Sequence, residues 1–136
     1  MPPSPARTLR LYFDGGCRPN PGPIETAVVV RGTEHVTPAA GQGDNSDAEW
    51  LALIHAATVA REWIAGGVEP VDALLFIGDA AQVIRQARGD QPCRDARLAA
   101  HRARFLALAA TLPPIRLRHV RRSHNLAGIV LDRRHR

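Results

Sequence analysis

Three carboxylates occupy positions from which their side chains can meet at one end of a β-sheet. Asp14 follows an alternating segment and leads into a stretch rich in Gly and Pro. Glu49 stands near the start of a helix-forming segment, and Asp79 closes a short apolar run. Converging carboxylates repel one another unless a divalent cation neutralises them, and oxygen ligands suit Mg²⁺ or Mn²⁺. The pattern therefore indicates a metal-dependent phosphodiester hydrolase.

Each of these acids also has a structural explanation. Asp14 precedes a glycine, and Asp-Gly is a common turn pair. Glu49 lies three residues after Ser46, which is the spacing of a capping box. Asp79 is placed to cap a short helix predicted at residues 81–88. The order in which the three acids follow one another along the chain favours a functional role for all of them.

Length and composition indicate one globular domain. The chain has 136 residues, of which 45% are apolar, enough for a substantial core. It contains no apolar run of roughly 18 residues that would cross a membrane, and its first residues lack the apolar core of a secretory signal. We expect a single cytoplasmic, monomeric domain over residues 1–136, with flexible ends at 1–6 and 133–136, and no disulfide in that compartment.

The charge of the chain favours a polyanionic partner. The net charge is +5, and all eighteen basic residues are Arg. A GC-rich coding sequence accounts for the missing Lys. The positive balance still suits nucleic acid, because Arg grips phosphate with two parallel hydrogen bonds.

Hydrophobic periodicity and turn residues predict an α/β domain. Strands are expected at residues 7–14, 25–32, 35–40, 74–77 and 115–120, and helices at 48–65, 81–88, 94–112 and 125–132. The first three strands are joined by short connections, which predicts an antiparallel meander. The order βββαβααβα then predicts a five-stranded mixed sheet with helices on both faces.

Four segments, taken in order, resemble type 1 ribonuclease H in its short bacterial and archaeal form. Residues 12–22 carry Asp14, a Gly pair and an Asn-Pro-Gly turn, like the opening motif of that family. Residues 45–53 are similar to its Asn-containing loop and helix-borne Glu, and residues 78–84 to its third motif, an Asp before a helix. Residues 118–125 are similar to its last strand and the loop that follows. The resemblance spans nearly the whole chain and implies a ribonuclease H-like fold.

The resemblance implies cleavage of the RNA strand of RNA–DNA hybrids, leaving 5′-phosphate and 3′-hydroxyl ends. Two Mg²⁺ ions, or Mn²⁺ in their place, would serve as cofactors. By motif position, Asp14 would bridge both ions, Glu49 would hold one of them, and Asp79 would help to place the attacking water. An RNA–DNA hybrid is then the expected partner, with no membrane and no obligate protein partner.

The last motif departs from the family, which carries a fourth Asp four residues after an Asn. Counting from Asn125 places Ile129 there, and a slip of one residue places Gly128; neither side chain binds a metal. We expect Asn125 to supply a neutral ligand instead, with Asp132 as the alternative. The neighbouring His124 is either a proton-transfer or product-release residue or a solvated loop residue.

Telling RNA from DNA requires groups that bind the 2′-hydroxyl, which both donates and accepts hydrogen bonds. Side-chain amides and backbone amides suit this task. The candidates for substrate binding are Gly15, Gly16, Cys17, Asn20, Asn45 and Gln82.

Two other functions remain open. The missing fourth acid is compatible with a catalytically weakened module that binds hybrids without cutting them. A related nuclease acting on DNA is the second alternative. The Asn-Pro-Gly turn at residues 20–22 argues against the nuclease acting on DNA, because that turn goes with the branch of the family that cleaves hybrids.

Overall fold

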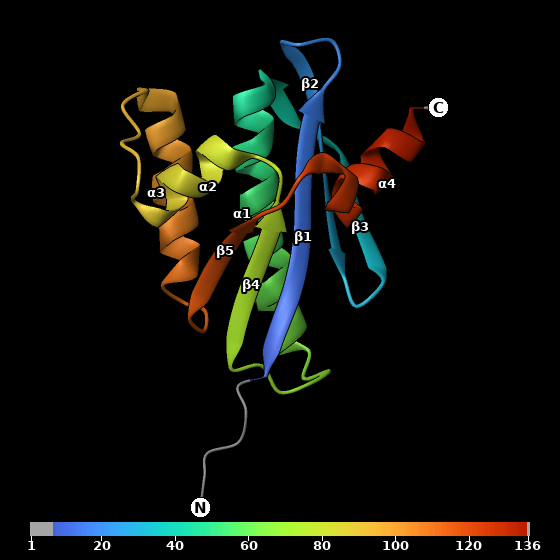
Figure 1. Cartoon of the computed structure of the whole chain (residues 1–136), viewed down its shortest axis with the longest axis vertical. Coiled ribbons are helices and arrows are strands. Elements are labelled where there is room, and N and C mark those ends of the chain that lie inside the picture. The colour runs from blue at the N-terminus through green and yellow to red at the C-terminus, as the bar shows by residue number, and fades with distance from the viewer. Residues whose placement is uncertain (1–6, 136) are drawn as a thin grey trace, which may run out of the picture.

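One mixed five-stranded sheet organises the chain, and the computed structural model describes it over residues 7–135 (Figure 1). The elements are β1 Thr8–Cys17, β2 Gly22–Val30, β3 Thr33–Gly43, α1 Asn45–Ala65, β4 Ala73–Gly78, α2 Ala81–Arg88, α3 Ala96–Ala109, β5 Ile115–His119, a 3₁₀ turn η1 Arg122–His124 and α4 Leu126–Arg134. The strand order is β3-β2-β1-β4-β5. The first three strands are antiparallel, β4 is parallel to β1, and β5 is parallel to β4. The predicted fold class is confirmed.

The two faces of the sheet are covered unequally. Leu9, Leu11 and Phe13 of β1 point into the larger core, which also contains buried residues of α1, α2 and α3. On the opposite face, Ala27 and Val29 of β2 pack with α4 in a smaller cluster. The alternation along β1 and β2 produces this division, because successive side chains of a strand point to opposite faces. No helix in the described part of the chain has the length and apolarity needed to cross a membrane.

Several element boundaries differ from those expected. β1 continues past Asp14, because its ladder with β2 runs on to the pair Cys17–Ile24. β3 likewise extends beyond its expected end at residue 40, through residues 41–43, and Gly43 pairs with Gly22. Asp14 therefore lies within the paired part of the β1–β2 hairpin rather than at the end of a strand.

The start of α1 is capped by residues other than those predicted. The side chain of Asp44 accepts a hydrogen bond from the amide of Asp47 at 3.0 Å, and the side chain of Asp47 accepts one from the amide of Asp44 at 3.0 Å. The predicted capping box of Ser46 and Glu49 is therefore wrong. This reciprocal cap leaves the Glu49 carboxylate free for another role.

The C-terminal end is tied to the sheet. Arg133 donates to both carboxylate oxygens of Glu34 on β3 at 2.7 and 2.8 Å. Arg134 and His135 both pair with Glu25 on β2. Residues 133–135 are therefore part of α4 and its ion pairs rather than a flexible tail, while residues 1–6 and 136 lie outside the described residues.

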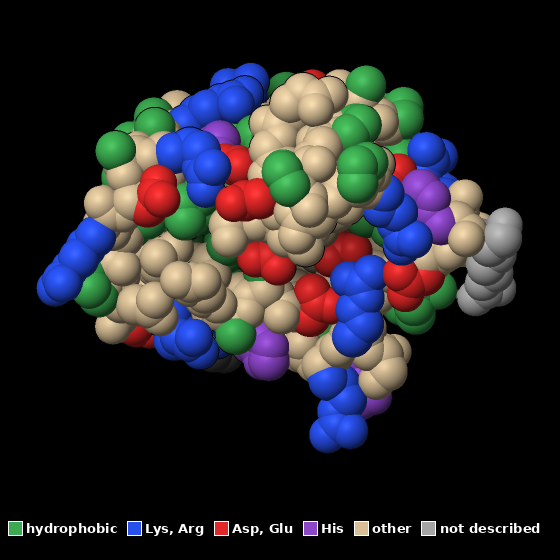
Figure 2. All heavy atoms as spheres, turned by 90° about the horizontal axis from the view of Figure 1, so that it is seen from above, with side chains coloured by type: hydrophobic (Ala, Val, Ile, Leu, Met, Phe, Trp, Pro, Cys, Tyr) green, Lys and Arg blue, Asp and Glu red, His purple; other side chains and the backbone are tan. Residues whose placement is uncertain are grey.

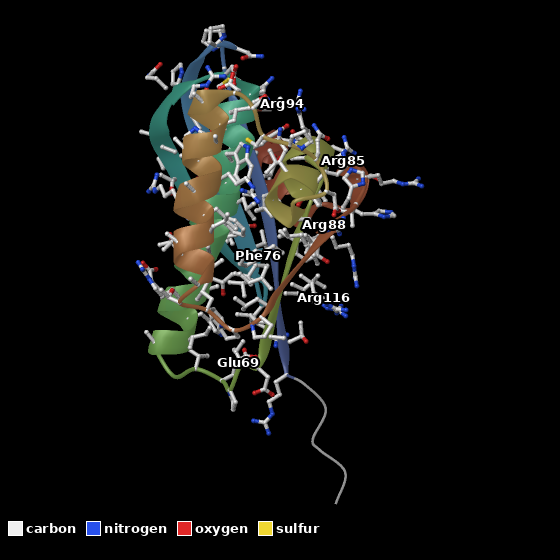
Figure 3. The ribbon with its side chains drawn as sticks, turned by 90° about the vertical axis from the view of Figure 1, so that its left-hand side faces the viewer. Glu69, Phe76, Arg85, Arg88, Arg94 and Arg116 are labelled. Carbon is white, nitrogen blue, oxygen red and sulfur yellow. The ribbon has the colours of Figure 1, made fainter. Side chains whose placement is uncertain are left out.

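A groove runs along the opposite edge of the sheet, between β5, α2 and α3. Its volume is about 600 Å³, and its lining includes Arg88, Phe105, Arg116 and Leu117. The Arg88 guanidinium donates to the backbone carbonyl of Leu117 and so covers part of the open edge of β5. Arg88 and Arg116 both lie on this side of the molecule (Figure 3). None of the three predicted catalytic acids lines this groove.

Candidate active site

The pairing of β1 with β4 brings two of the acids to the same level of the sheet. Tyr12 and Ile77 are partners in this parallel ladder. Asp14 lies two residues after Tyr12, and Asp79 lies two residues after Ile77. The two acids therefore lie on the same face of the sheet and at the same height along the strands. Asp14 is only 5% exposed, and Asp79 comes immediately after the last residue of β4.

Close packing of α1 against β1 brings Glu49 to the same end of the sheet. A side chain on Gly15 would place its Cβ 2.1 Å from the backbone oxygen of Ala48, so only glycine allows this approach. Glu49 follows Ala48 in the first turns of α1. The end of the sheet at the top of Figure 1 faces the viewer in Figure 2, where acidic side chains gather beside basic ones.

The charges of the acids act on one another. Burial raises the pKa of Asp14 to about 6, against the opposing attraction of Arg122. Burial also raises the pKa of Glu49 to about 7, with further contributions from the charges of Asp79 and Asp14. These shifts describe carboxylates that are short of positive charge.

Arg122 of η1 reaches into this cluster. Its Nη1 lies 2.7 Å from Oδ1 of Asp14 and 3.2 Å from Oδ2 of Asp79, and its Nη2 lies 2.9 Å from Oδ1 of Asp132. Burial disfavours the charged guanidinium, but the attraction of Asp14 and the hydrogen bonds to the acids raise the pKa of Arg122 above its ordinary value. One cation therefore bridges acids from β1, from the end of β4 and from α4.

The donor set has the chemistry of a site for a hard cation. Asp14, Glu49 and Asp79 offer only carboxylate oxygens, which are the ligands that Mg²⁺ and Mn²⁺ prefer. Within residues 7–135, no three His, Cys, Asp or Glu side chains lie together in the arrangement of a metal site. The cluster instead holds a guanidinium. The acids fit a divalent cation by their charge, and Asp14 and Glu49 do so also by their raised pKa values.

Asn125 plays a structural role. Its side chain is fully buried, its Nδ2 donates to the carbonyl of Phe13 at 3.0 Å, and its Oδ1 accepts from the amide of Ala127 at 3.2 Å. Both ends of the amide are thus used to cap α4 and to fasten it to β1. Asp132, the alternative fourth ligand, contacts Arg122, which in turn contacts Asp14 and Asp79.

The other predicted residues of the last motif are at the surface. Ile129, which the resemblance aligns with the fourth acid of the family, is 41% exposed. His124 is exposed in η1.

Three of the predicted substrate-binding residues come together where β1, the β1–β2 turn and α1 meet. Sγ of Cys17 lies 3.4 Å from Oδ1 of Asn20 and 3.4 Å from Oδ1 of Asn45. The backbone amide of Asn45 also donates to Oδ1 of Asn20 at 3.3 Å. Burial, followed by the charges of Asp44 and Asp47, raises the pKa of the Cys17 thiol, which therefore stays protonated.

The remaining predicted residues stand apart from this group. Gln82 is exposed in the first turn of α2. Gly16 faces open space, because a Cβ there would meet no atom within 4 Å. The backbone at Gly16 is therefore accessible to a ligand, whereas Gly15 is required for packing.

Arg122 is the site residue that the sequence analysis missed. It lies within the segment 118–125 that resembles the last family motif, but that resemblance assigns it no role. The only available signal was the lack of an acid at Gly128 and Ile129. The fold brings Arg122 of η1 into contact with Asp14, Asp79 and Asp132.

Solved structures provide the comparison with known proteins. A scan of protein-family models gives no match, and neither does a search of curated proteins. Ribonuclease H1 from the halophilic archaeon Halobacterium salinarum superposes with a TM-score of 0.80 and 28% identity, over 91% of this chain and 93% of that one. The chain has a ribonuclease H-like fold.

Two further structures agree with this assignment of the ribonuclease H-like fold. The N-terminal ribonuclease H domain of a Mycobacterium tuberculosis protein has a TM-score of 0.76 and 25% identity, over 94% of this chain and 96% of that one. LC11 ribonuclease H1 in complex with an RNA/DNA hybrid has a TM-score of 0.76 and 24% identity, over 87% of this chain and 88% of that one.

Replacing Glu49 by Gln is expected to stabilise the metal-free protein at pH 8. The folded-state pKa of Glu49 is about 7, above its ordinary value of 4.5, so stability falls as pH rises from about 4.5 through 7. Allowing for partial exposure, we expect a gain of about 1–2 kcal/mol at pH 8 and almost none at pH 4.5. Urea denaturation in the presence of a chelator measures it. Glu62→Gln on the exposed face of α1 is the control, and an equal gain there would contradict the explanation.

The two neighbouring glycines are expected to respond differently to alanine. Gly15→Ala places a Cβ against the Ala48 carbonyl, and overpacking of this kind costs about 1–3 kcal/mol of unfolding free energy. Gly16→Ala meets no atom and is expected to change stability by less than about 0.5 kcal/mol. Urea denaturation of both variants checks this, and equal stability of the pair would show that α1 does not need the close approach to β1.

Proposed function

We propose that the chain is a divalent-metal-dependent endoribonuclease that hydrolyses the RNA strand of RNA–DNA hybrids and leaves 5′-phosphate and 3′-hydroxyl ends. The observation that carries the proposal is the ribonuclease H-like fold, in which Asp14 and Asp79 lie at one level of the sheet and Glu49 lies in the first turns of the helix packed against β1. Burial and mutual repulsion leave two of these acids, Asp14 and Glu49, with raised pKa values. A structure of the same fold in complex with an RNA/DNA hybrid supports the choice of substrate.

Mg²⁺ or Mn²⁺ would be held by Asp14, Glu49 and Asp79. When bound, such an ion supplies a nucleophilic water at neutral pH and neutralises charge that develops on the phosphate. The chain itself fixes the acids on a rigid sheet and a capped helix, so that little reorganisation is needed when the ion binds. His124, exposed on η1, is assigned to proton transfer or product release.

Recognition of the hybrid would involve the group formed by Cys17, Asn20 and Asn45. Their amide and thiol groups are held together by hydrogen bonds and are suited to the minor groove, where the 2′-hydroxyl is displayed. The open backbone at Gly16 adds a further contact, and Gln82 extends the surface along α2. The net charge of +5 favours binding of the phosphate backbone.

A second function, binding of hybrids without cleavage, is favoured by one observation. Arg122 pairs with Asp14 and Asp79, two of the acids expected to hold the metal. A module of this kind would keep the recognition group and lose turnover.

Cleavage of a short labelled RNA–DNA hybrid tests the proposal. Purified protein is incubated with Mg²⁺ or with Mn²⁺, with duplex DNA and duplex RNA as substrate controls. We expect cleavage of the RNA strand alone, and a fall of about 100-fold or more in Asp14→Asn, because the cation loses its buried ligand. Asp90→Asn, an exposed acid after α2, is the matched control variant. Tight binding without cleavage in either metal would establish the binding module instead.

A further inference from the structure

Within residues 7–135, helices cover one face of the sheet only in part. On that face α4 packs on β1 and β2, whereas α1, α2 and α3 pack on the opposite face. The partly covered face is turned toward the viewer in Figure 1, and no helix lies in front of β4 and β5 there. Figure 3 shows Arg116 of β5 pointing away from α3, on this uncovered side.

Basic side chains flank apolar ones across the uncovered strands. Arg10 of β1 pairs with Leu75 of β4, and Leu75 pairs with Arg116 of β5. Two residues further along these strands, Ile77 of β4 pairs with Arg118 of β5. Residues that are paired across strands, or two apart on one strand, share a face of the sheet. All three arginines therefore project from the uncovered face.

The acids of the candidate active site lie on the same face, further along the same strands. Asp14 follows Arg10 by four residues, and Asp79 follows Leu75 by four residues. An even spacing keeps the acids and the arginines on one face, and four residues of strand span about 13 Å. A chain of phosphates that reaches the acids can therefore continue over β4 and β5.

The arginines of this face are available to an external anion. All three are exposed, and no carboxylate of the described residues forms an ion pair with Arg10, Arg116 or Arg118. Five other arginines are paired with acids of the chain: Arg31, Arg97, Arg122, Arg133 and Arg134. A guanidinium without a partner attracts phosphate and can bind it through two parallel N–H donors.

We propose that this face, defined by Arg10, Arg116 and Arg118, binds the phosphate backbone of the nucleic acid where it extends from the acids over β4 and β5. The inference rests on the proposed function, because it takes the acids as the place where the hybrid is cut. Phosphate contacts fix the position of a duplex without reading its sequence. The face therefore positions the substrate, and the choice of the RNA strand is left to the recognition group and the acids.

Binding of a labelled RNA–DNA hybrid, followed by fluorescence anisotropy in a chelator, tests the inference without cleavage. A hybrid of about 16 base pairs is long enough to pass the arginines, at about 3.4 Å per pair. Each phosphate contact adds about 0.9 to the slope of log affinity against log salt concentration. For Arg116→Gln/Arg118→Gln we expect this slope to fall by about 1.8, and the affinity at about 0.1 M salt to fall about tenfold or more.

Two further double variants separate position from charge. Arg61→Gln/Arg104→Gln removes the same charge from exposed arginines of α1 and α3, and is expected to keep the slope of the unmodified chain. Arg116→Lys/Arg118→Lys keeps the charge on the face and is also expected to keep the slope. Circular dichroism confirms folding. If Arg116→Gln/Arg118→Gln fails to fold, Arg10→Gln decides, with an expected fall in slope of about 0.9.

Equal losses of slope and affinity in Arg116→Gln/Arg118→Gln and Arg61→Gln/Arg104→Gln would overturn the inference, because binding would then follow net charge alone. Displacement of the hybrid by an equal concentration of a polyglutamate peptide would also overturn it, in favour of an acidic protein partner.

Cleavage of the hybrid by the unmodified chain distinguishes this failure from failure of the proposed function. A chain that cuts hybrids, and whose two double Gln variants bind alike, keeps its proposed function and loses this binding face. A chain that cuts in neither metal but shows the expected fall in slope keeps the binding face and loses the proposed nuclease activity.

Discussion

Repulsion between carboxylates confined at one end of the sheet is the constraint on which the arrangement of this site depends. Asp14 is almost fully buried on the central strand, where a charge is costly unless a cation accompanies it. Asp79 and Glu49 add to this cost, and the raised pKa values of Asp14 and Glu49 reflect it. The surrounding structure holds the acids in place despite their repulsion, and Arg122 relieves part of it.

The rigidity needed to hold these charges comes from packing that leaves little room to move. Gly15 brings α1 against β1, and a Cβ at Gly78 would lie 2.6 Å from the ring of Phe13. The buried Asn125 joins α4 to β1 through the carbonyl of that same Phe13. The elements that carry the acids are thus fastened to one another around β1, so relief of repulsion by outward movement would require breaking core contacts.

Most of the fold could be predicted from the sequence, because periodicity and turn residues act locally. The helix at 81–88 was predicted with its observed bounds, since Gly89 ends it in a left-handed conformation with φ of 83°. The start of α1 was misplaced because two pairs of residues have capping-box spacing, Ser46 with Glu49 and Asp44 with Asp47, and the second pair forms the cap. Asp47 is also contacted by His101 of α3 at 2.9 Å. A contact over 54 residues leaves no local pattern in the sequence.

The fourth position of the site shows why residue type alone does not identify a ligand. The side chain of Asn125 has an oxygen that could bind a metal, and Asn125 lies in the last motif. The sequence therefore favoured Asn125 as the fourth metal ligand. A buried side-chain amide, however, must form hydrogen bonds through both its donor and its acceptor. At the start of a helix, the side-chain oxygen accepts a hydrogen bond from one of the unpaired backbone amides. The capping requirement therefore removes Asn125 from the choice, and Asp132 joins the cluster only because Arg122 reaches between it and Asp14. Arg122 thus supplies positive charge to acids of three elements, and neither its residue type nor its place in the motif reveals this.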